Sequence, residues 1–322
     1  MSIPSNASRR HVRTTDGLEL AVTEYAGPPD DPHAPVIVCV HGYPDNQTVW
    51  TPVAQRLASR FRVVTYDVRG CGDSDAPRDR SGYLIPRLNA DLAAVIDAVS
   101  PDAPVHLLAH DWGSIQTWSA VGGNVPATRI ASYTSISGPD LDQAAVWLRG
   151  LAKNGLAGAR KRLAQLAESY YVFLFQTPRL PEAVWRSGVL EKLLAREFRG
   201  VDAEVREVVT HRERDRINGI ELYRANILGR LGRPAPRPVE VPVQVIAPTR
   251  DIYVSMPLAT EAPRPYVADL TVVTVEGRHW VVLERPDHIA ELVAGFATAH
   301  AAGGGVGEAT DGPAGHENGT QA

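Results

Sequence analysis

Residues 105–120 have the sequence VHLLAHDWGSIQTWSA, in which a short apolar run is followed by a turn and then by a helical pattern. The run at 105–109 predicts a buried strand, and 114–120 predicts the start of a helix. The turn between them has the form of a nucleophile elbow, a sharp strand-to-helix turn that presents one side chain. Asp111 occupies the nucleophile position of this turn.

An aspartate at this position restricts the chemistry. A carboxylate is ionised at neutral pH and can attack saturated carbon, giving an ester whose carbonyl belongs to the protein and can then be hydrolysed. A serine attacking the same carbon would leave an ether that water cannot open in this way. Asp111 therefore indicates opening of an epoxide or displacement of a halide. The simpler alternative is that Asp111 only caps the following helix.

Composition indicates an ordinary globular chain. Its 322 residues suffice for one large α/β domain with an insertion or for two average domains. The net charge of -4 gives no reason to expect nucleic acid as a partner, and we interpret the basic run Arg160-Lys161-Arg162 as a solvated helix face. Cys39 and Cys71 are too few for a disulfide framework and lack metal-ligand spacing. We expect no metal and no cofactor.

The N-terminus lacks the apolar stretch of a signal peptide, and no uncharged run approaches the length needed to span a membrane. We therefore expect a cytoplasmic protein without a transmembrane segment. The sequence leaves open whether the protein forms a homodimer.

Short β-rich runs alternate with helical patterns in the first half of the chain. Residues 16–25 predict a turn and a strand of an opening hairpin. The runs at 36–40, 62–66 and 105–108 are each followed by a glycine-containing loop and a helical pattern. This alternation predicts a parallel sheet covered by helices on both faces.

The pattern changes after residue 137, because residues 141–231 have helical periodicity without a convincing strand. This predicts a lid of several helices inserted into the core. Strand patterns return at 241–247 and 270–275, and 287–299 predicts a final amphipathic helix. The predicted division is an α/β core at residues 1–139, a helical cap at 140–237, the core again at 238–300 and a disordered tail at 301–322.

Candidate partners of Asp111 follow it in chain order. Asp251 and His279 each lie in a loop after a late predicted strand, as the acid and the histidine of an elbow enzyme do. His279 would take a proton from water during ester hydrolysis, and Asp251 would orient and stabilise the imidazole. Asp140 also follows a predicted strand and is the alternative acid.

The segment His41-Gly42-Tyr43-Pro44 follows the strand at 36–40 and predicts an oxyanion hole. The backbone N–H groups of Tyr43 and Trp112 would stabilise the oxyanion that forms on the Asp111 carboxyl. A plain turn is the alternative. Gly70-Cys71-Gly72 does not predict nucleotide binding, because no third glycine stands at the required spacing.

Five motifs follow one another along the chain, HGYP at 41–44, DVRGCGDS at 67–74, HDWG at 110–113, Asp251 and GRHW at 277–280. As a set they closely resemble the α/β-hydrolase-fold epoxide hydrolases from about Val12 to Ala299, and several are shared with haloalkane dehalogenases. The resemblance implies an α/β-hydrolase fold, with a mostly parallel sheet flanked by helices and an inserted helical cap. It implies Asp111 as nucleophile, His279 as base and Asp251 as its acid partner, acting on a hydrophobic epoxide and water.

That family also uses two cap tyrosines to hydrogen-bond and protonate the epoxide oxygen. The residues that match are Tyr171, in YVFLFQ, and Tyr223, in LYRAN. A strained ring opens more easily when its oxygen is partly protonated, which gives these phenols a physical purpose. Tyr170 is an alternative to Tyr171, and packing of an amphipathic helix is the alternative for Tyr223.

Two departures from the family pattern are visible. Ala109 stands where the elbow usually begins with glycine. The chain is also similar to the hydrolase half of actinobacterial proteins in which such a domain precedes a short-chain dehydrogenase. No dinucleotide fingerprint follows Ala299, so we expect neither reductase activity nor NADP binding.

The leading hypothesis is therefore hydrolysis of an epoxide to a vicinal diol through an ester on Asp111. Haloalkane dehalogenation is the second, because the indole of Trp112 could bind a halide, although Tyr43 stands where a halide-binding asparagine is common. A non-catalytic module that binds a lipid-like ligand is the third. A serine esterase is least favoured, because the chain has no Gly-x-Ser-x-Gly elbow.

Overall fold

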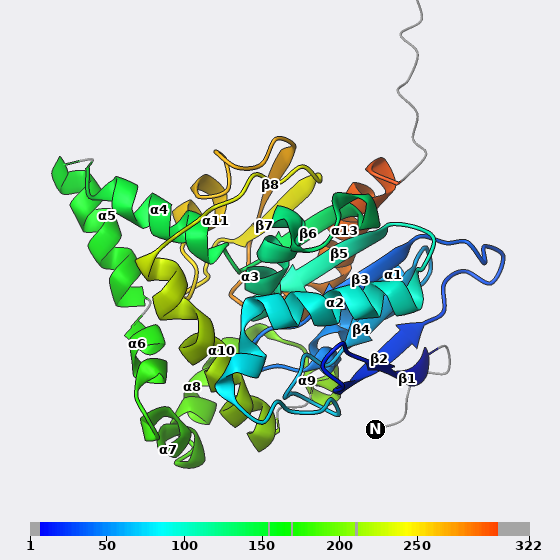
Figure 1. The fold of residues 1–322 in the computed structure, drawn as a ribbon, viewed down its shortest axis with the longest axis horizontal. Coiled ribbons are helices and arrows are strands. Elements are labelled where there is room, and N and C mark those ends of the chain that lie inside the picture. The colour runs from blue at the N-terminus through cyan, green and yellow to red at the C-terminus, as the bar shows by residue number, and fades with distance from the viewer. Residues whose placement is uncertain (1–6, 154, 169, 210–211, 302–322) are drawn as a thin grey trace, which may run out of the picture.

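The computed structural model describes residues 7–153, 155–168, 170–209 and 212–301. Eight strands form one sheet in the order β1-β2-β4-β3-β5-β6-β7-β8 (Figure 1). The pairs β1·β2 and β2·β4 are antiparallel, and all other neighbours in this order pair parallel. The strands are β1 (Ala7–Arg13), β2 (Glu19–Tyr25), β3 (Val36–Val40), β4 (Arg62–Tyr66), β5 (Val105–His110), β6 (Ile130–Ile136), β7 (Val243–Pro248) and β8 (Leu270–Val275).

Helices cover the two faces of the sheet, with α2 and α3 in front of it and α13 behind it in Figure 1. Every residue of β3 and β5 is buried, because both faces of these central strands are covered. The edge strand β1 is mostly exposed. The predicted fold class is thus confirmed. The helices of the core are α1 (Thr51–Leu57), α2 (Ile85–Val99), α3 (Trp112–Ser119), α11 (Met256–Glu261), α12 (Val281–Glu284) and α13 (Pro286–Ala299).

Between β6 and β7 the described residues form helices and connecting loops without a strand of the sheet, as the periodicity predicts. The boundaries of core and cap at 139/140 and 237/238 stay predictions, and the predicted tail lies outside the described residues except for Ala301. The helices of this region are α4 (Leu141–Leu151), α5 (Gly155–Glu168), α6 (Tyr170–Gln176), α7 (Leu180–Arg186), α8 (Val189–Glu197), α9 (Ala203–Val208) and α10 (Glu213–Gly232).

Helix α10 fastens the cap to the core through buried side chains. The carboxylate of Asp215 accepts hydrogen bonds from the amide of Gly72 at 2.8 Å and from the side chain of Asn46 at 2.9 Å. Further along the helix, the side-chain oxygen of Asn226 accepts from the amide of Ile85 at 2.9 Å. Buried polar groups with these partners fix the position of α10, since losing a partner would leave a polar group unsatisfied.

None of the helices in the described part of the chain combines the length and the apolar character that crossing a bilayer requires.

Candidate active site

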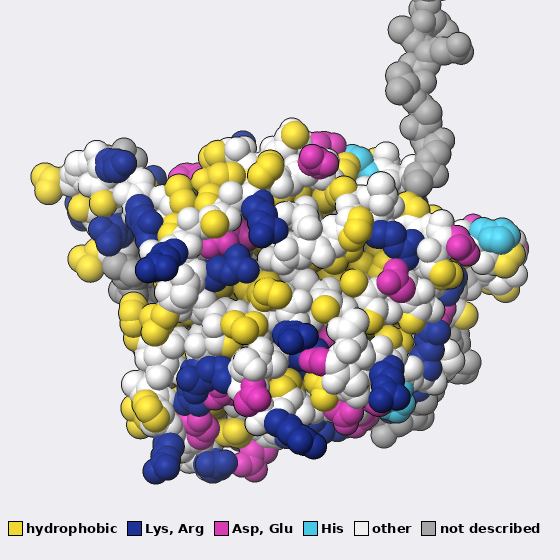
Figure 2. Space-filling view, viewed as in Figure 1, with side chains coloured by type: hydrophobic (Ala, Val, Ile, Leu, Met, Phe, Trp, Pro, Cys, Tyr) yellow, Lys and Arg dark blue, Asp and Glu magenta, His cyan; other side chains and the backbone are white. Residues whose placement is uncertain are grey.

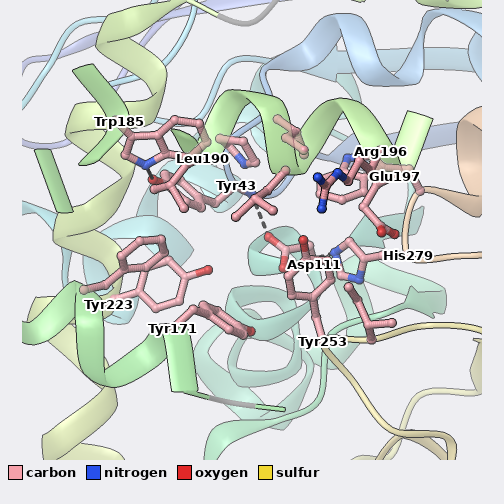
Figure 3. A pocket seen from close by; sticks show the side chains of 16 residues that line it. Tyr43, Asp111, Tyr171, Trp185, Leu190, Arg196, Glu197, Tyr223, Tyr253 and His279 are labelled. Atoms are coloured by element: carbon pink, nitrogen blue, oxygen red, sulfur yellow. Dashed lines mark hydrogen bonds and ion pairs between the residues drawn. The ribbon is translucent and has the colours of Figure 1, made fainter. Parts of the chain in front are cut away.

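Asp111 lies in the turn between β5 and α3, with φ of 52° and ψ of −123°. A non-glycine residue in this region costs about 1–3 kcal/mol, so the surrounding packing must hold it there. Gly113 is part of that packing, because a Cβ at this position would lie 2.1 Å from the carbonyl oxygen of Val40 at the end of β3. The turn therefore has the geometry of the predicted elbow and places the Asp111 carboxylate at the floor of a cavity (Figure 3).

The loop after β3 approaches this carboxylate closely. The amide of Tyr43 donates a hydrogen bond of 2.7 Å to Oδ1 of Asp111. Gly42 permits the approach, because a Cβ there would lie 2.4 Å from the same oxygen. Tyr43 is thus placed as one donor of the predicted oxyanion hole. Trp112, the second predicted donor, is the first residue of α3, and no hydrogen bond from its amide to Asp111 is present among the described residues.

His279 lies between two carboxylates. Its Nε2 is 3.5 Å from Oδ2 of Asp111, and its Nδ1 is 3.0 Å from Oδ2 of Asp251. Asp251 also accepts hydrogen bonds from the amides of Tyr253 at 2.8 Å and Val254 at 3.1 Å, which fix the orientation of its carboxylate. The structure therefore brings together the three residues that sequence order predicted.

The two carboxylates determine the charge of the imidazole. Burial alone would lower the pKa of His279, but the negative charges of Asp251 and Asp111 outweigh burial and raise this pKa to about 10. Burial in turn would raise the pKa of Asp251, but the adjacent His279 and the two amides lower it below its usual value. At neutral pH the resting site therefore holds an imidazolium between two carboxylates.

Asp140, the alternative acid, has another structural setting. Its carboxylate caps α4 by accepting a hydrogen bond of 2.7 Å from the amide of Gln143. It lines a small separate cavity beside Trp118, and burial raises its pKa to about 6. Nδ1 of His279 is already paired with Asp251, so the structure joins Asp251 and not Asp140 to the histidine.

The cavity in front of Asp111 has a volume of about 360 Å³ and lies between the core and the cap. Tyr171 from α6 and Tyr223 from α10 both line it, with ring centroids 6.0 Å apart. Figure 3 shows their hydroxyl groups directed toward the space in front of Asp111. Burial raises the pKa of Tyr223 well above its usual value, and the nearby Tyr171 and Asp111 raise it further. This phenol is therefore protonated across the physiological pH range. The side chain of Tyr170 lies outside the described residues.

Tyr43 also has a side-chain role that its motif does not indicate. Its hydroxyl donates to the carbonyl oxygen of Arg216 at 2.8 Å and accepts from Nε1 of Trp185 at 2.6 Å. Its ring lies against α10 so closely that a Cβ on Gly219 would be 2.2 Å away. One residue thus connects the amide that binds Asp111 to helices α7 and α10 of the cap.

Two further residues of the cavity were missed in the sequence. The ring of Tyr253 packs edge-on against His279 with centroids 4.8 Å apart, and its position two residues after Asp251 could have suggested this. Glu197, at the end of α8, lines the cavity on the side of His279 (Figure 3). Its Oε2 is buried without a hydrogen-bond partner among the described residues, and burial raises its pKa against the opposing effects of Arg278 and His279. No motif marks Glu197.

Within the described ranges, no group of three or more His, Cys, Asp or Glu side chains is arranged to hold a metal ion. Cys39 and Cys71 are both buried and unpaired. Burial raises the pKa of the Cys39 thiol and, together with nearby carboxylates, that of Cys71. Neither thiol is therefore poised as a nucleophile.

Comparison with known proteins gives one family and a consistent set of relatives. Residues 35–286 match the family model described as alpha/beta hydrolase fold. "Probable oxidoreductase EphD" of Mycobacterium tuberculosis is 33% identical over 298 residues, which are 89% of this chain and 49% of that protein. "Epoxide hydrolase 4" of Mus musculus is 25% identical, over 81% of this chain and 72% of that protein.

Solved structures give the same result for the fold. An epoxide hydrolase from Bacillus megaterium in complex with an inhibitor has a TM-score of 0.73 at 19% identity, over 90% of this chain and 100% of that one. Epoxide hydrolase VrEH1 from Vigna radiata has a TM-score of 0.69 at 25% identity, over 91% of this chain and 99% of that one. These comparisons confirm the resemblance that the motifs indicated.

The chain spans about half the length of the EphD proteins that it matches. The expected similarity to the first half of a fusion with a short-chain dehydrogenase stays a prediction.

Proposed function

We propose that this chain, which belongs to the alpha/beta hydrolase fold family, hydrolyses an epoxide to a vicinal diol through a covalent ester on Asp111. One observation carries the proposal. A single cavity holds the Asp111 carboxylate, an imidazole beside it and two phenols directed toward the space in front of it. This set contains a nucleophile, a base and an acid for opening a strained ring and hydrolysing the resulting ester.

The first step forms the ester. Oδ1 of Asp111 is bound by the amide of Tyr43, which leaves Oδ2 for attack on an epoxide carbon. As the bond from Oδ2 to carbon forms, the bond from carbon to the ring oxygen breaks, and that oxygen takes a proton from Tyr171 or Tyr223. Both phenols face this space, so the epoxide oxygen would point toward the cap and the carbon toward Asp111.

The charges balance through His279. Ester formation removes the negative charge of Asp111, one of the two carboxylates that raise the pKa of His279. The imidazolium therefore becomes more acidic, and its proton replaces the one that the phenol gave up. The product of the first step is a hydroxy ester beside a neutral imidazole, which is the form that can act as a base.

The second step hydrolyses the ester. Neutral His279 takes a proton from a water molecule, whose oxygen attacks the carboxyl carbon of Asp111. The amide of Tyr43 stabilises the oxyanion on Oδ1, and Asp251, 3.0 Å from Nδ1, stabilises the returning imidazolium. The bond from the Asp111 carboxyl carbon to the diol oxygen then breaks, and that oxygen takes the second proton of the water. Release of the diol leaves the Asp111 carboxylate, with one oxygen from water, beside the imidazolium.

The cavity favours an apolar substrate. Its walls near the phenols are formed mainly by aliphatic and aromatic side chains, and a volume of about 360 Å³ accommodates a substrate of moderate size. The apolar wall residues include Phe175, Trp185, Leu190, Leu193, Leu194 and Ile252.

Isotope labelling tests the covalent route. A single turnover in heavy-oxygen water should place the heavy oxygen in the peptide that contains Asp111 and leave the first diol unlabelled. In a His279→Gln variant, the intact protein should gain the mass of the epoxide and keep it, because the base of the second step is missing. Heavy oxygen delivered directly to the first diol would overturn the proposal.

Dehalogenation is the competing reaction of the same nucleophile. Trp112, the residue expected to bind a halide, is not among the residues that line the cavity, and its ring packs against Tyr223 with centroids 4.8 Å apart. The side chain of Tyr43 is directed to the cap rather than toward a halide. Halide release from chloro- and bromoalkanes should therefore be negligible beside diol formation.

A further inference from the structure

Helix α5 presents two leucines to solvent. Leu156 and Leu163, seven residues apart and therefore on one face, are 87% and 70% exposed. On the opposite face Gly158 is buried, and Gln165 is buried with its side-chain oxygen accepting a hydrogen bond from Ser255. An amphipathic helix on a globular protein normally has the reverse arrangement, with its apolar residues inward. The outward leucines therefore need a partner other than the fold.

The exposed apolar surface continues along the next two helices. Phe173 on α6 is 56% exposed, and Leu180 at the start of α7 is 48% exposed. Helices α5, α6 and α7 follow one another along one edge of the molecule (Figure 1), and hydrophobic side chains lie along the same edge in Figure 2. We call Leu156, Leu163, Phe173 and Leu180 the outer cap face. Exposed apolar side chains gathered along one edge are typical of an interaction site.

The same part of the chain is strongly basic. Residues 149–186 contain seven Lys and Arg against two Glu, a net charge of +5 within a chain of net charge -4. Arg160, Lys161 and Arg162 lie between the two exposed leucines, are exposed, and form no ion pair with a described residue. Two of the counted charges are paired with residues outside this segment, Glu182 with Arg224 and Arg186 with Glu213.

We propose that the outer cap face binds the surface of an anionic lipid bilayer. Apolar side chains that insert among acyl chains, flanked by basic side chains that pair with anionic headgroups, are the recognition elements of an interfacial helix. A second copy of the chain is disfavoured as the occupant, because a twofold contact would place two surfaces of net positive charge against each other. Anionic lipid supplies the opposite charge together with an apolar layer.

The position of this face connects it to the cavity. Helices α6 and α7 carry Phe173 and Leu180 outward, and the same two helices carry Tyr171, Phe175 and Trp185 into the cavity wall. A bilayer on the outer cap face would lie one helix thickness from the cavity. Given the proposed function, an apolar epoxide dissolved in the bilayer would be concentrated beside the cap. The lipid binding itself does not depend on the reaction.

Vesicle flotation of the purified full chain tests the proposal. The protein should float with vesicles of phosphatidylcholine and phosphatidylglycerol, should stay behind with phosphatidylcholine alone, and should be released by high salt. Two combined variants should each weaken binding at least about tenfold. One replaces both leucines, Leu156→Gln with Leu163→Gln, and the other replaces the basic run, Arg160→Gln with Lys161→Gln and Arg162→Gln. Absence of flotation with anionic vesicles would overturn the proposal.

Matched variants control for the loss of apolar surface and of charge. Leu84→Gln removes a leucine that is 40% exposed on the core. Arg13→Gln with Arg78→Gln and Arg264→Gln removes three exposed charges outside the cap. Both controls should float like the parent, and equal weakening by controls and test variants would overturn the assignment to the outer cap face. Self-association that is lost on Leu156→Gln would also overturn it, in favour of a second copy.

Turnover without vesicles separates this proposal from the proposed function. The α5 variants should hydrolyse a small water-soluble epoxide at the parental rate, which also shows that they are folded. A parent protein that floats with anionic vesicles but forms no diol would contradict the proposed function and leave the lipid-binding face standing.

Discussion

The core half and the cap half of the site are built by different means. Asp111, Asp251 and His279 lie in loops that follow the parallel strands β5, β7 and β8, and hydrogen bonds from backbone amides hold the two carboxylates. Tyr171 and Tyr223 lie on helices α6 and α10, and the packing of those helices on the core sets where their hydroxyls point. The core positions atoms through the sheet, whereas the cap positions them through side-chain packing.

This difference suggests a division of labour. In the proposed mechanism, the core holds the groups that make and break bonds to carbon, and these must keep their geometry through two chemical steps. In the same mechanism the cap supplies protons and the shape of the cavity, and displacing one of its groups should weaken the reaction without abolishing it. Variants of the core should therefore lose more activity than variants of the cap.

Asp111→Asn provides the strongest test on the core side. An amide is a poor nucleophile toward saturated carbon, so kcat should fall at least about 10,000-fold. The variant should also gain no mass from the epoxide. Steady-state rates and intact-protein mass spectra measure both effects, provided that the spectra also confirm that the amide has not hydrolysed. Unchanged diol formation would show that another group is the nucleophile, and binding of epoxides without turnover in the parent would favour the non-catalytic module.

The next test compares two carboxylates of the core. Asp251→Asn should slow ester hydrolysis about 1,000-fold, because Nδ1 of His279 loses the charge that stabilises its cation. Asp140→Asn should leave the rate within about threefold, since asparagine also caps a helix and Asp140 has no contact with His279. Rapid-quench measurement of the ester resolves the step affected. The reverse ranking would assign the acid role to Asp140.

The core half could be predicted from sequence for a physical reason. In a parallel sheet the carboxyl ends of the strands meet at one edge, so a polar residue directly after each strand pattern is placed near the others. The apolar runs of β5, β7 and β8 were visible, and Asp111, Asp251 and His279 follow them closely. Chain order favoured Asp251 over Asp140, and only the coordinates show which carboxylate reaches the imidazole.

The cap half could be predicted only where it resembles a family. Helical periodicity indicates which residues share a face, but not which neighbouring helix that face will contact. Tyr171 and Tyr223 were found through their motifs, whereas Glu197 and the side-chain contacts of Tyr43 carry no local signal. The exposed leucines of α5 were also hidden, because periodicity assigns such residues to the inside.

Removal of the cap phenols should have an intermediate effect. Tyr171→Phe and Tyr223→Phe should each slow ester formation about 10- to 100-fold, since one hydroxyl can still bind the epoxide oxygen, and the double variant should lose more than either. Hydrolysis of an ester already formed should keep its rate. Tyr170→Phe is the matched control and should retain the parental rate. Equal losses for Tyr170→Phe and Tyr171→Phe would contradict the assignment of Tyr171.

Glu197→Gln should have the smallest effect on the rate of ester hydrolysis, but the direction in which its pH dependence shifts is diagnostic. Glu197 lies near His279, and its negative charge favours the imidazolium form of that residue. The other charged groups close to Glu197 are Asp251, Glu284 and Arg278. Removing that negative charge should lower the pKa of His279 in the ester intermediate. Because the neutral imidazole would be the base, the acid limb of the pH–rate profile of ester hydrolysis should move to lower pH, by about 0.5 unit.

At pH values on that limb the Glu197→Gln variant should therefore hydrolyse the ester faster than the parent, an increase in activity that mere loss of packing does not produce. Single-turnover rates against pH measure the shift. Glu191→Gln is the matched control, because it removes the same charge from the same helix α8. The side chain of Glu191 is 57% exposed and faces Arg216. The acid limb of this variant should therefore stay within about 0.1 pH unit of the parent. An acid limb that stays at the parental pH on Glu197→Gln would mean that this part of the cap does not act on the charge of the core imidazole. The separation between the two halves would then be sharper than the structure indicates.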